Sequence, residues 1–304
     1  MRRLKIEEPT SVLMRDLWRH SGLQLSPGDP LWSVLDTVVT MAPRIQDLYL
    51  GNNAQHGTCP DLVLHHHHLL QLGSLKDLTV LELESLELST VEEMLTRLGS
   101  RLRRVTLTNI CVDLGFVLST LPQAHLLELR NTRVVLSDEE DDTRELPWSH
   151  ITTTSSSLTE LVIDYTVSLE VLYFCLTKVP SLTRLSVGHG RHRYSQRSSV
   201  RRLTPSRWED LLAVSHLPVL QHLVIPVLFQ PDLNSPQSTV SILDFEDVRK
   251  VFRTFPRLET AVLHRRQYQR SGDQSNFPFV LSDRRPELSS YPYRHIGYIN
   301  LMDF

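Results

Sequence analysis

The chain has 304 residues, of which 40% are hydrophobic and 22% charged, and its formal net charge is −3. This apolar content supports a buried core, the slight negative charge argues against nucleic acid as the main partner, and no stretch of about 18 apolar residues predicts a membrane span. The three cysteines, Cys59, Cys111 and Cys175, are odd in number and far apart, which is typical of reduced thiols and predicts a cytoplasmic or nuclear protein.

Residues 1–41 are predicted to form helices. One candidate runs from Pro9 to Arg19. A second begins at Asp29-Pro30, where a polar capping residue precedes a proline at the first helical position. Helices at the end of a stack of repeats cover its apolar edge. We therefore expect residues 1–41 to be an N-terminal helical cap for the elements that follow.

Residues 42–268 contain one apolar pattern, LxxLxL, eight times. Its last two apolar residues are two positions apart, so both point to the same face of a short strand. One such unit cannot bury its apolar row alone, whereas stacked neighbours share one continuous core. The pattern therefore predicts about eight stacked parallel strands. The eight copies are Ile45-Leu48-Leu50, Leu78-Leu81-Leu83, Leu102-Val105-Leu107, Ala124-Leu127-Leu129, Leu158-Leu161-Ile163, Leu182-Leu185-Val187, Leu220-Leu223-Ile225 and Leu258-Ala261-Leu263.

A helix is predicted between the second and third copies. Ser89 or Thr90, followed by Glu92 and Glu93, is typical of a capping box at the start of a helix. Gly99 is the kind of residue that ends one. The apolar residues between these signals fall at helical spacing and are expected to face the core. They are Val91, Met94, Leu95 and Leu98.

Three more helices have start signals between later copies. Ser168 and Asp244 are good capping residues, and Thr204-Pro205 combines a cap with a proline at the first helical position. Prolines at 122, 180, 218 and 256 precede four of the strands, where they stop a helix and start the return to the sheet. The helix after Thr204 is expected to bury Trp208, Leu211, Leu212 and Val214.

In this pattern the chain resembles leucine-rich-repeat proteins of the irregular type found in F-box and related intracellular proteins. The resemblance covers roughly residues 42–268 and implies an α/β solenoid, an irregular horseshoe with parallel concave strands and outer helices. The asparagine or cysteine that usually follows the strand has one matching position, Asn53, which favours an uneven arc. Residues 269–304 are expected to form a C-terminal cap or tail.

The resemblance also implies a protein–protein interaction module, with substrate recognition in an F-box-type ubiquitin ligase as its setting. An adaptor site would then lie near the N-terminus, but residues 1–41 lack the Leu-Pro-x-Glu-like opening of an F-box. A degenerate F-box and a missing one both remain open.

The residues between and beside the apolar pair of each strand are predicted to point to the concave face. Their mixture of acidic and basic side chains favours recognition of a protein partner by charge complementarity. The predicted partner-binding residues are Tyr49, Glu82, Glu84, Arg104, Thr106, Glu128, Arg130, Glu160, Asp164, Arg184, His222 and His264.

Other segments suggest other chemistry. The insertion 191–207 is rich in arginine with interleaved histidine and tyrosine, so RNA or phosphate binding is the alternative function, and a free-standing repeat scaffold is another. His65–His68 has a spacing that can hold zinc, but no third ligand is placed by the sequence, so we predict no metal. The acidic run 138–142 is interpreted as a solvated loop. No GxSxG, GxxxxGK, HExxH or paired CxxC motif occurs, so we predict neither an enzyme nor a bound cofactor.

Overall fold

The structure of the chain is a computed structural model that describes eight parts of it. Those parts are residues 3–7, 44–51, 74–136, 157–188, 205–225, 245–263, 266–271 and 279–281.

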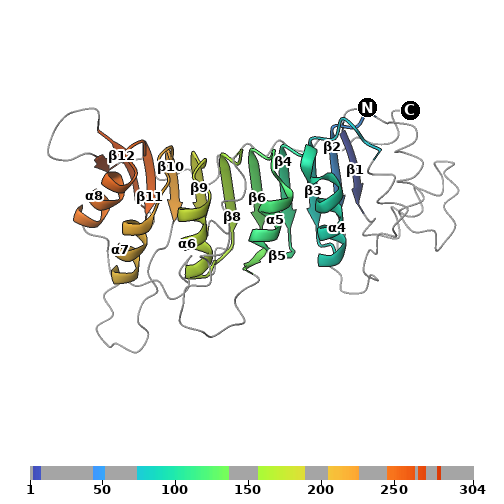
Figure 1. Cartoon of the computed structure of the whole chain (residues 1–304). Helices are drawn as coiled ribbons and strands as arrows, with labels where there is room; N and C mark the ends of the chain where they lie inside the picture. Colours follow the sequence, from blue (N-terminus) through green and yellow to red (C-terminus); the bar gives the residue numbers. More distant parts are fainter. Residues whose placement is uncertain are drawn as a thin grey trace, which may run out of the picture.

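These residues form a mixed α/β structure around one large, mostly parallel sheet (Figure 1). The order of strands in the sheet follows their order in the chain, so each new strand is added beside the previous one. Such an arrangement needs a crossover between parallel neighbours, and the helices of the described residues provide five of these crossovers. The parallel strands are β1 (Arg3–Glu7), β2 (Asp47–Gly51), β3 (Val80–Glu84), β4 (Arg104–Thr108), β6 (Leu126–Arg130), β8 (Glu160–Asp164), β9 (Arg184–Val187), β10 (His222–Ile225) and β11 (Thr260–Leu263).

The helices lie on one side of the sheet (Figure 1). A short second sheet pairs β5 (Cys111–Asp113) with β7 (Arg133–Val135). None of the helices in the described parts of the chain is long and apolar enough to cross a membrane. The helices are α4 (Leu88–Leu98), continued by the 3-10 turn η2 (Gly99–Arg101), α5 (Leu114–Thr120), α6 (Leu169–Lys178), α7 (Pro205–Val214) and α8 (Phe245–Thr254).

The core lies between the sheet and the helices. Every residue of the eight LxxLxL copies is at most 1% exposed, which confirms the predicted direction of these side chains. In the sheet register Leu48 lies beside Leu81, and the matching positions continue from strand to strand. Each fully buried leucine or isoleucine contributes roughly 1.5–3 kcal/mol, so stacking of these rows is the main source of stability.

Two predicted helix starts are confirmed. Ser168 caps α6, because its side chain accepts a hydrogen bond from the backbone N–H of Val171 at 3.2 Å. α7 begins at Pro205, as its proline signal predicts. One expected core residue of α7 is wrong, since Val214 is 50% exposed. Val214 follows the buried Leu212 by two positions and therefore points about 200° around the helix axis from it.

The predicted capping box is also wrong. α4 begins at Leu88, its N-cap Glu87 makes no side-chain capping bond, and Thr90 lies inside the first turn as a buried residue. Glu93 instead pairs with Arg97 one turn later, at 2.9 Å. The apolar residues predicted to face the core from α4 are all buried. The hydrophobic spacing therefore located the helix, while the polar signal misplaced its start by two or three residues.

Both ends of the sheet carry strands that the sequence does not predict. β1 lies within residues 1–41, whereas the two helices expected there lie outside the described residues. At the other end, β12 (Arg266–Arg270) and β13 (Phe279–Leu281) extend the sheet in antiparallel fashion from β11. The guanidinium of Arg270 donates to the backbone carbonyl oxygens of Phe252 at 3.0 Å and Phe255 at 3.1 Å. β12 thereby satisfies carbonyls at the C-terminal end of α8.

Candidate functional site

The candidate site is the side of the sheet that faces away from α4–α8, which we name the distal face. Alternation along each strand directs every second side chain there, and the register aligns these side chains into rows about 4.8 Å apart from strand to strand. The first row is Asp47, Val80, Arg104, Leu126, Glu160, Arg184, His222 and Thr260. The middle row is Tyr49, Glu82, Thr106, Glu128, Val162, Ser186, Val224 and Val262. The last row is Glu84, Thr108, Arg130 and Asp164.

Two predicted contact residues in the middle row are largely inaccessible to solvent. Tyr49 is only 8% exposed and Thr106 only 4%. Thr106 is a short side chain between Glu82 and Glu128 on the neighbouring strands. The phenol of Tyr49 donates a hydrogen bond to the carboxylate of Glu84. The register places Tyr49 and Thr106 on the distal face, where both are buried; their contact with a partner stays a prediction.

Two of the predicted carboxylates are held by neighbouring side chains. Glu128 and Arg130 form a two-pronged ion pair, with Nε–Oε1 and Nη2–Oε2 distances of 2.8 and 2.9 Å. Glu84 accepts from Tyr49 and lies 3.5 Å from Nδ2 of Asn109. These contacts orient both carboxylates, so changing either residue also removes a structural contact.

A row of left-handed residues follows the strands at their C-terminal ends. Ser85, Asn109 and Asn131 have φ of 53°, 55° and 45°, a region in which asparagine is better tolerated than most residues. The backbone N–H of Asn109 donates to the carbonyl of Arg130 at 3.0 Å, and its side-chain oxygen accepts from Asn131 at 2.6 Å. Next to this row, the hydroxyl of buried Thr132 lies 3.0 Å from the carbonyl oxygen of Leu107. A threonine thus satisfies backbone carbonyls where the resemblance would place asparagine.

The first row includes the charged residues Asp47, Arg104 and Glu160. Arg104 is exposed, and Asp47 and Glu160 are half-buried. Within the described ranges these three residues make no ion pair. Val80 and Leu126 are half-buried between them and are absent from the predicted contact residues. Strand alternation could have identified both residues, because Val80 lies two positions before Glu82 and Leu126 lies two positions before Glu128.

The β8–β11 part of the distal face is less charged. Its middle row is Val162, Ser186, Val224 and Val262, and the register places Arg184 between Glu160 and His222. Nδ1 of His222 lies 2.7 Å from the hydroxyl of Thr260 on the next strand. His264, predicted as the last contact residue, lies outside the described residues. The middle row therefore changes from polar and charged residues over β2–β6 to mainly apolar ones over β8–β11.

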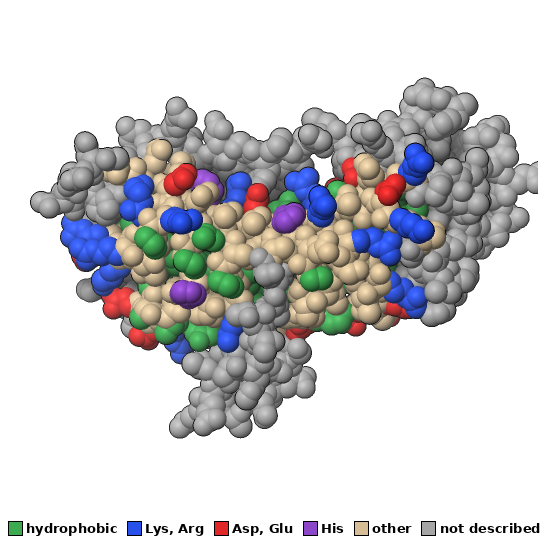
Figure 2. All heavy atoms as spheres, turned by 45° about the horizontal axis from the view of Figure 1, so that its top comes forward, with side chains coloured by type: hydrophobic (Ala, Val, Ile, Leu, Met, Phe, Trp, Pro, Cys, Tyr) green, Lys and Arg blue, Asp and Glu red, His purple; other side chains and the backbone are tan. Residues whose placement is uncertain are grey.

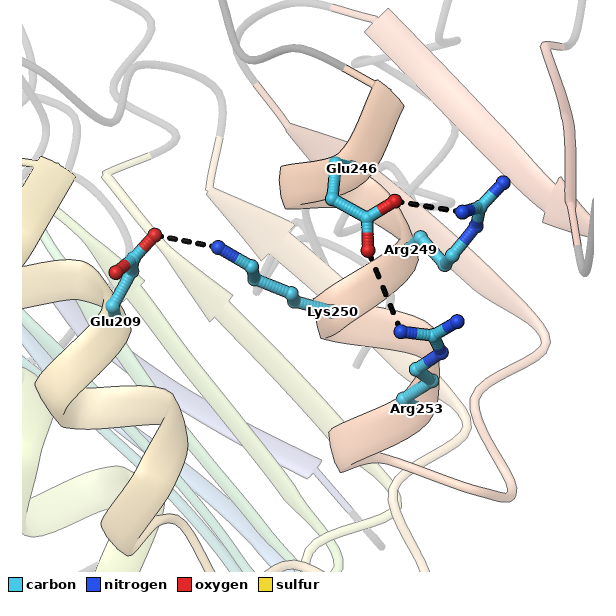
Figure 3. A network of polar contacts seen from close by, with 5 residues as sticks. All are labelled: Glu209, Glu246, Arg249, Lys250 and Arg253. Atoms are coloured by element: carbon cyan, nitrogen blue, oxygen red, sulfur yellow. Dashed lines mark hydrogen bonds and ion pairs between the residues drawn. The ribbon is translucent and has the colours of Figure 1, made fainter.

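The helix side carries a separate group of charges. Figure 2 shows Lys and Arg side chains at both ends of the molecule, including the end that holds α8. Figure 3 shows Lys250 of α8 reaching Glu209 of α7, with Nζ and Oε1 at 2.6 Å, and Glu246 meeting Arg249 at 2.7 Å and Arg253 at 3.4 Å. The hydrogen bond to Glu209 raises the pKa of Lys250. These basic side chains are therefore largely engaged by acidic neighbours on the same helices.

The structure gives no arrangement of described residues that supports the alternative RNA, phosphate or metal chemistry. Of the basic insertion 191–207, the structure describes the side chain of Arg207 alone, which is exposed on α7. His65–His68 and the acidic run 138–142 lie outside the described residues, and within the described ones no three His, Cys, Asp or Glu side chains are grouped to hold a metal. Burial raises the pKa of the Cys175 thiol to about 12, so it is a protonated core residue and not a nucleophile.

No family model matches the chain. Comparison with curated proteins also finds no match.

Proposed function

We propose that the chain is a protein-binding module of the leucine-rich-repeat type, an irregular solenoid whose distal face receives a folded partner. One observation carries the proposal. Eight consecutive copies of one apolar triplet supply eight neighbouring parallel strands, and their outward residues align in rows across the face opposite the helices. Stacked repeats characteristically use such long surfaces for binding.

The resemblance to F-box-associated repeat proteins supplies the setting. Under this proposal the distal face holds a substrate protein of a ubiquitin ligase, and a separate segment recruits the ligase adaptor. Residues 1–41 are the candidate for that segment, of which the structure describes only β1. The two parts of the proposal are therefore tested by different readouts of one experiment.

Arg104 and Glu160 are the residues best suited to test the distal face. Both belong to its accessible first row, and neither forms an ion pair within the part of the chain that the structure describes. Glu84 and Glu128 are less suitable because Tyr49 and Arg130 hold their carboxylates. Reversing the charges of Arg104 and Glu160 should change recognition without disturbing the core.

The experiment captures proteins on the tagged full chain and quantifies them by mass spectrometry. The wild type is compared with Arg104→Glu/Glu160→Lys and with a matched charge reversal on the helix side, Arg253→Glu, whose side chain is 66% exposed. We expect the double variant to lose specific partners at least about tenfold, the control to keep them, and all three chains to have the same unfolding midpoint.

Two outcomes would contradict the proposal. Equal capture by all three chains would remove the distal face as the binding surface. Face-dependent capture without a ubiquitin-ligase adaptor or cullin would remove the ligase setting and leave a free-standing repeat scaffold.

A further inference from the structure

The first row of the distal face has a regular alternation across five neighbouring strands. Asp47 of β2 is acidic, Arg104 of β4 is basic and Glu160 of β8 is acidic, while Val80 of β3 and Leu126 of β6 stand between them. A charge of alternating sign thus occurs on every second strand, and an apolar residue on the strands between. Charges in such a pattern favour a partner whose own charges alternate in the opposite order.

This row is accessible to a partner. Arg104 is exposed and the other four residues are half-buried, in contrast to the buried Tyr49 and Thr106 of the middle row. Asp47, Arg104 and Glu160 form no ion pair among the described residues, so a partner need not first break one. Val80 and Leu126 flank Arg104 in the register and offer apolar contacts on both sides of its charge.

The spacing of the row matches an α-helix laid across the strands. Four steps of about 4.8 Å separate β2 from β8, which is about 19 Å. Fourteen residues of helix rise about 21 Å, and positions three or four apart lie on one side of the helix. About one turn of the helix therefore lies against each strand. Over the five strands the length of the helix and the length of the row differ by about 2 Å, which flexible side chains accommodate.

An extended segment laid in the same direction does not match. Its residues on one side repeat every 6.6–6.8 Å or so, so five of them span about 27 Å against the 19 Å of the row. By the second or third strand its side chains would stand between strands. The row therefore discriminates between the two regular forms that a partner segment can take.

We propose that the first row of β2–β8 receives an amphipathic α-helix of a partner protein with a charge-alternating heptad pattern. A basic residue of this helix faces Asp47, an acidic residue seven positions away faces Arg104, and a second basic residue seven further on faces Glu160. Apolar residues between them cover Val80 and Leu126. This inference rests on the proposed protein-binding function and specifies the partner element.

The test uses the full chain and fluorescently labelled, alanine-based helical peptides of about 22 residues. The matched peptide carries the pattern Lys, Leu, Glu, Leu, Lys at alternating steps of four and three residues. The swapped peptide exchanges Lys and Glu, and its net charge is balanced on the opposite helix face. Fluorescence anisotropy should show the wild-type chain binding the matched peptide about tenfold more tightly than the swapped one.

The reciprocal variant makes the test specific. Asp47→Lys/Arg104→Glu/Glu160→Lys should reverse the preference and bind the swapped peptide more tightly, while Arg253→Glu should keep the wild-type preference. Circular dichroism and unfolding midpoints confirm that each variant is folded. If the triple variant does not fold, the single variant Arg104→Glu replaces it and should reduce the preference for the matched peptide.

The inference is overturned if the wild type binds both helical peptides equally. It is also overturned if a proline-containing, non-helical peptide with the same order of side chains binds as tightly as the matched helix. Either result, combined with face-dependent partner capture by the full chain, would refute the helix while the proposed function survives. Partner capture that is unchanged by the distal-face variant would refute both the helix inference and the proposed function.

Discussion

Gly99 is the position at which helix propensity and packing predict opposite effects of a substitution. Its φ of −56° and ψ of −34° are right-handed helical, a conformation in which alanine is preferred over glycine by roughly 0.5–1 kcal/mol. Propensity alone therefore predicts that Gly99→Ala stabilises the chain.

The tertiary structure predicts the reverse. A Cβ at Gly99 would lie 2.1 Å from the carbonyl oxygen of Thr120, the last residue of α5, and 3.0 Å from its carbonyl carbon. The obstacle is backbone, so no side-chain rotation relieves it, and one of the two segments must move. Overpacking of this kind typically costs about 1–3 kcal/mol. After subtracting the propensity gain, we expect Gly99→Ala to lower the free energy of unfolding by about 1–2 kcal/mol.

Urea unfolding followed by circular dichroism measures this effect, and Gly115→Ala is the matched control. In α5 a Cβ at Gly115 would meet only the side-chain oxygen Oδ1 of Asp113, at 3.2 Å, so propensity should dominate and the change should be between zero and about 1 kcal/mol stabilising. If Gly99→Ala were as stable as the wild type or more stable, the close approach of α5 to the end of α4 would be refuted.

Four further predictions concern stability and reactivity. Arg270→Ala should lower the free energy of unfolding by about 2 kcal/mol, because charge-assisted hydrogen bonds to the end of α8 are lost. The stability of Arg270→Lys should lie between those of the wild type and Arg270→Ala. Asn109→Ala should cost about 1–2 kcal/mol because its φ is left-handed, whereas Asn109→Gly should be nearly neutral; both are read by urea unfolding. Since Glu209 raises the pKa of Lys250, the stabilisation from this pair is complete below the usual lysine pKa of about 10.4 and is lost as the pH rises through the raised value. The difference in unfolding midpoint between the wild type and Lys250→Met should therefore be constant near pH 8 and shrink above about pH 10.4; a constant difference would contradict the pairing. Cys175, whose pKa burial raises to about 12, should resist iodoacetamide in the folded chain and react in urea, as mapped by mass spectrometry.

The candidate face was only partly predictable. Strand alternation identified Glu82, Arg104 and Glu160 as distal-face residues without any knowledge of neighbours. The same rule reaches Val80 and Leu126, which occupy the same strand position as Arg104 and Glu160, but the predicted contact residues were restricted to polar and charged side chains. Accessibility could not be predicted, because it depends on which side chain stands on the next strand.

The LxxLxL spacing by itself determined which residues of each strand enter the core, because the two faces of a strand are set by local backbone geometry. Every one of those residues is buried. Local signals also placed the cap of α6 at Ser168 and the start of α7 at Pro205, since a capping bond or a fixed φ involves only adjacent residues.

Contacts between distant segments were decided by the tertiary structure alone. The requirement for glycine at position 99 comes from the backbone of Thr120, and the cap at the end of α8 comes from Arg270 on an antiparallel strand. The charge alternation of the first row exists only because the register aligns Asp47, Arg104 and Glu160 across strands. Alternation along a strand determines which face of the sheet a side chain occupies, but only the register between neighbouring strands determines which side chains lie beside it.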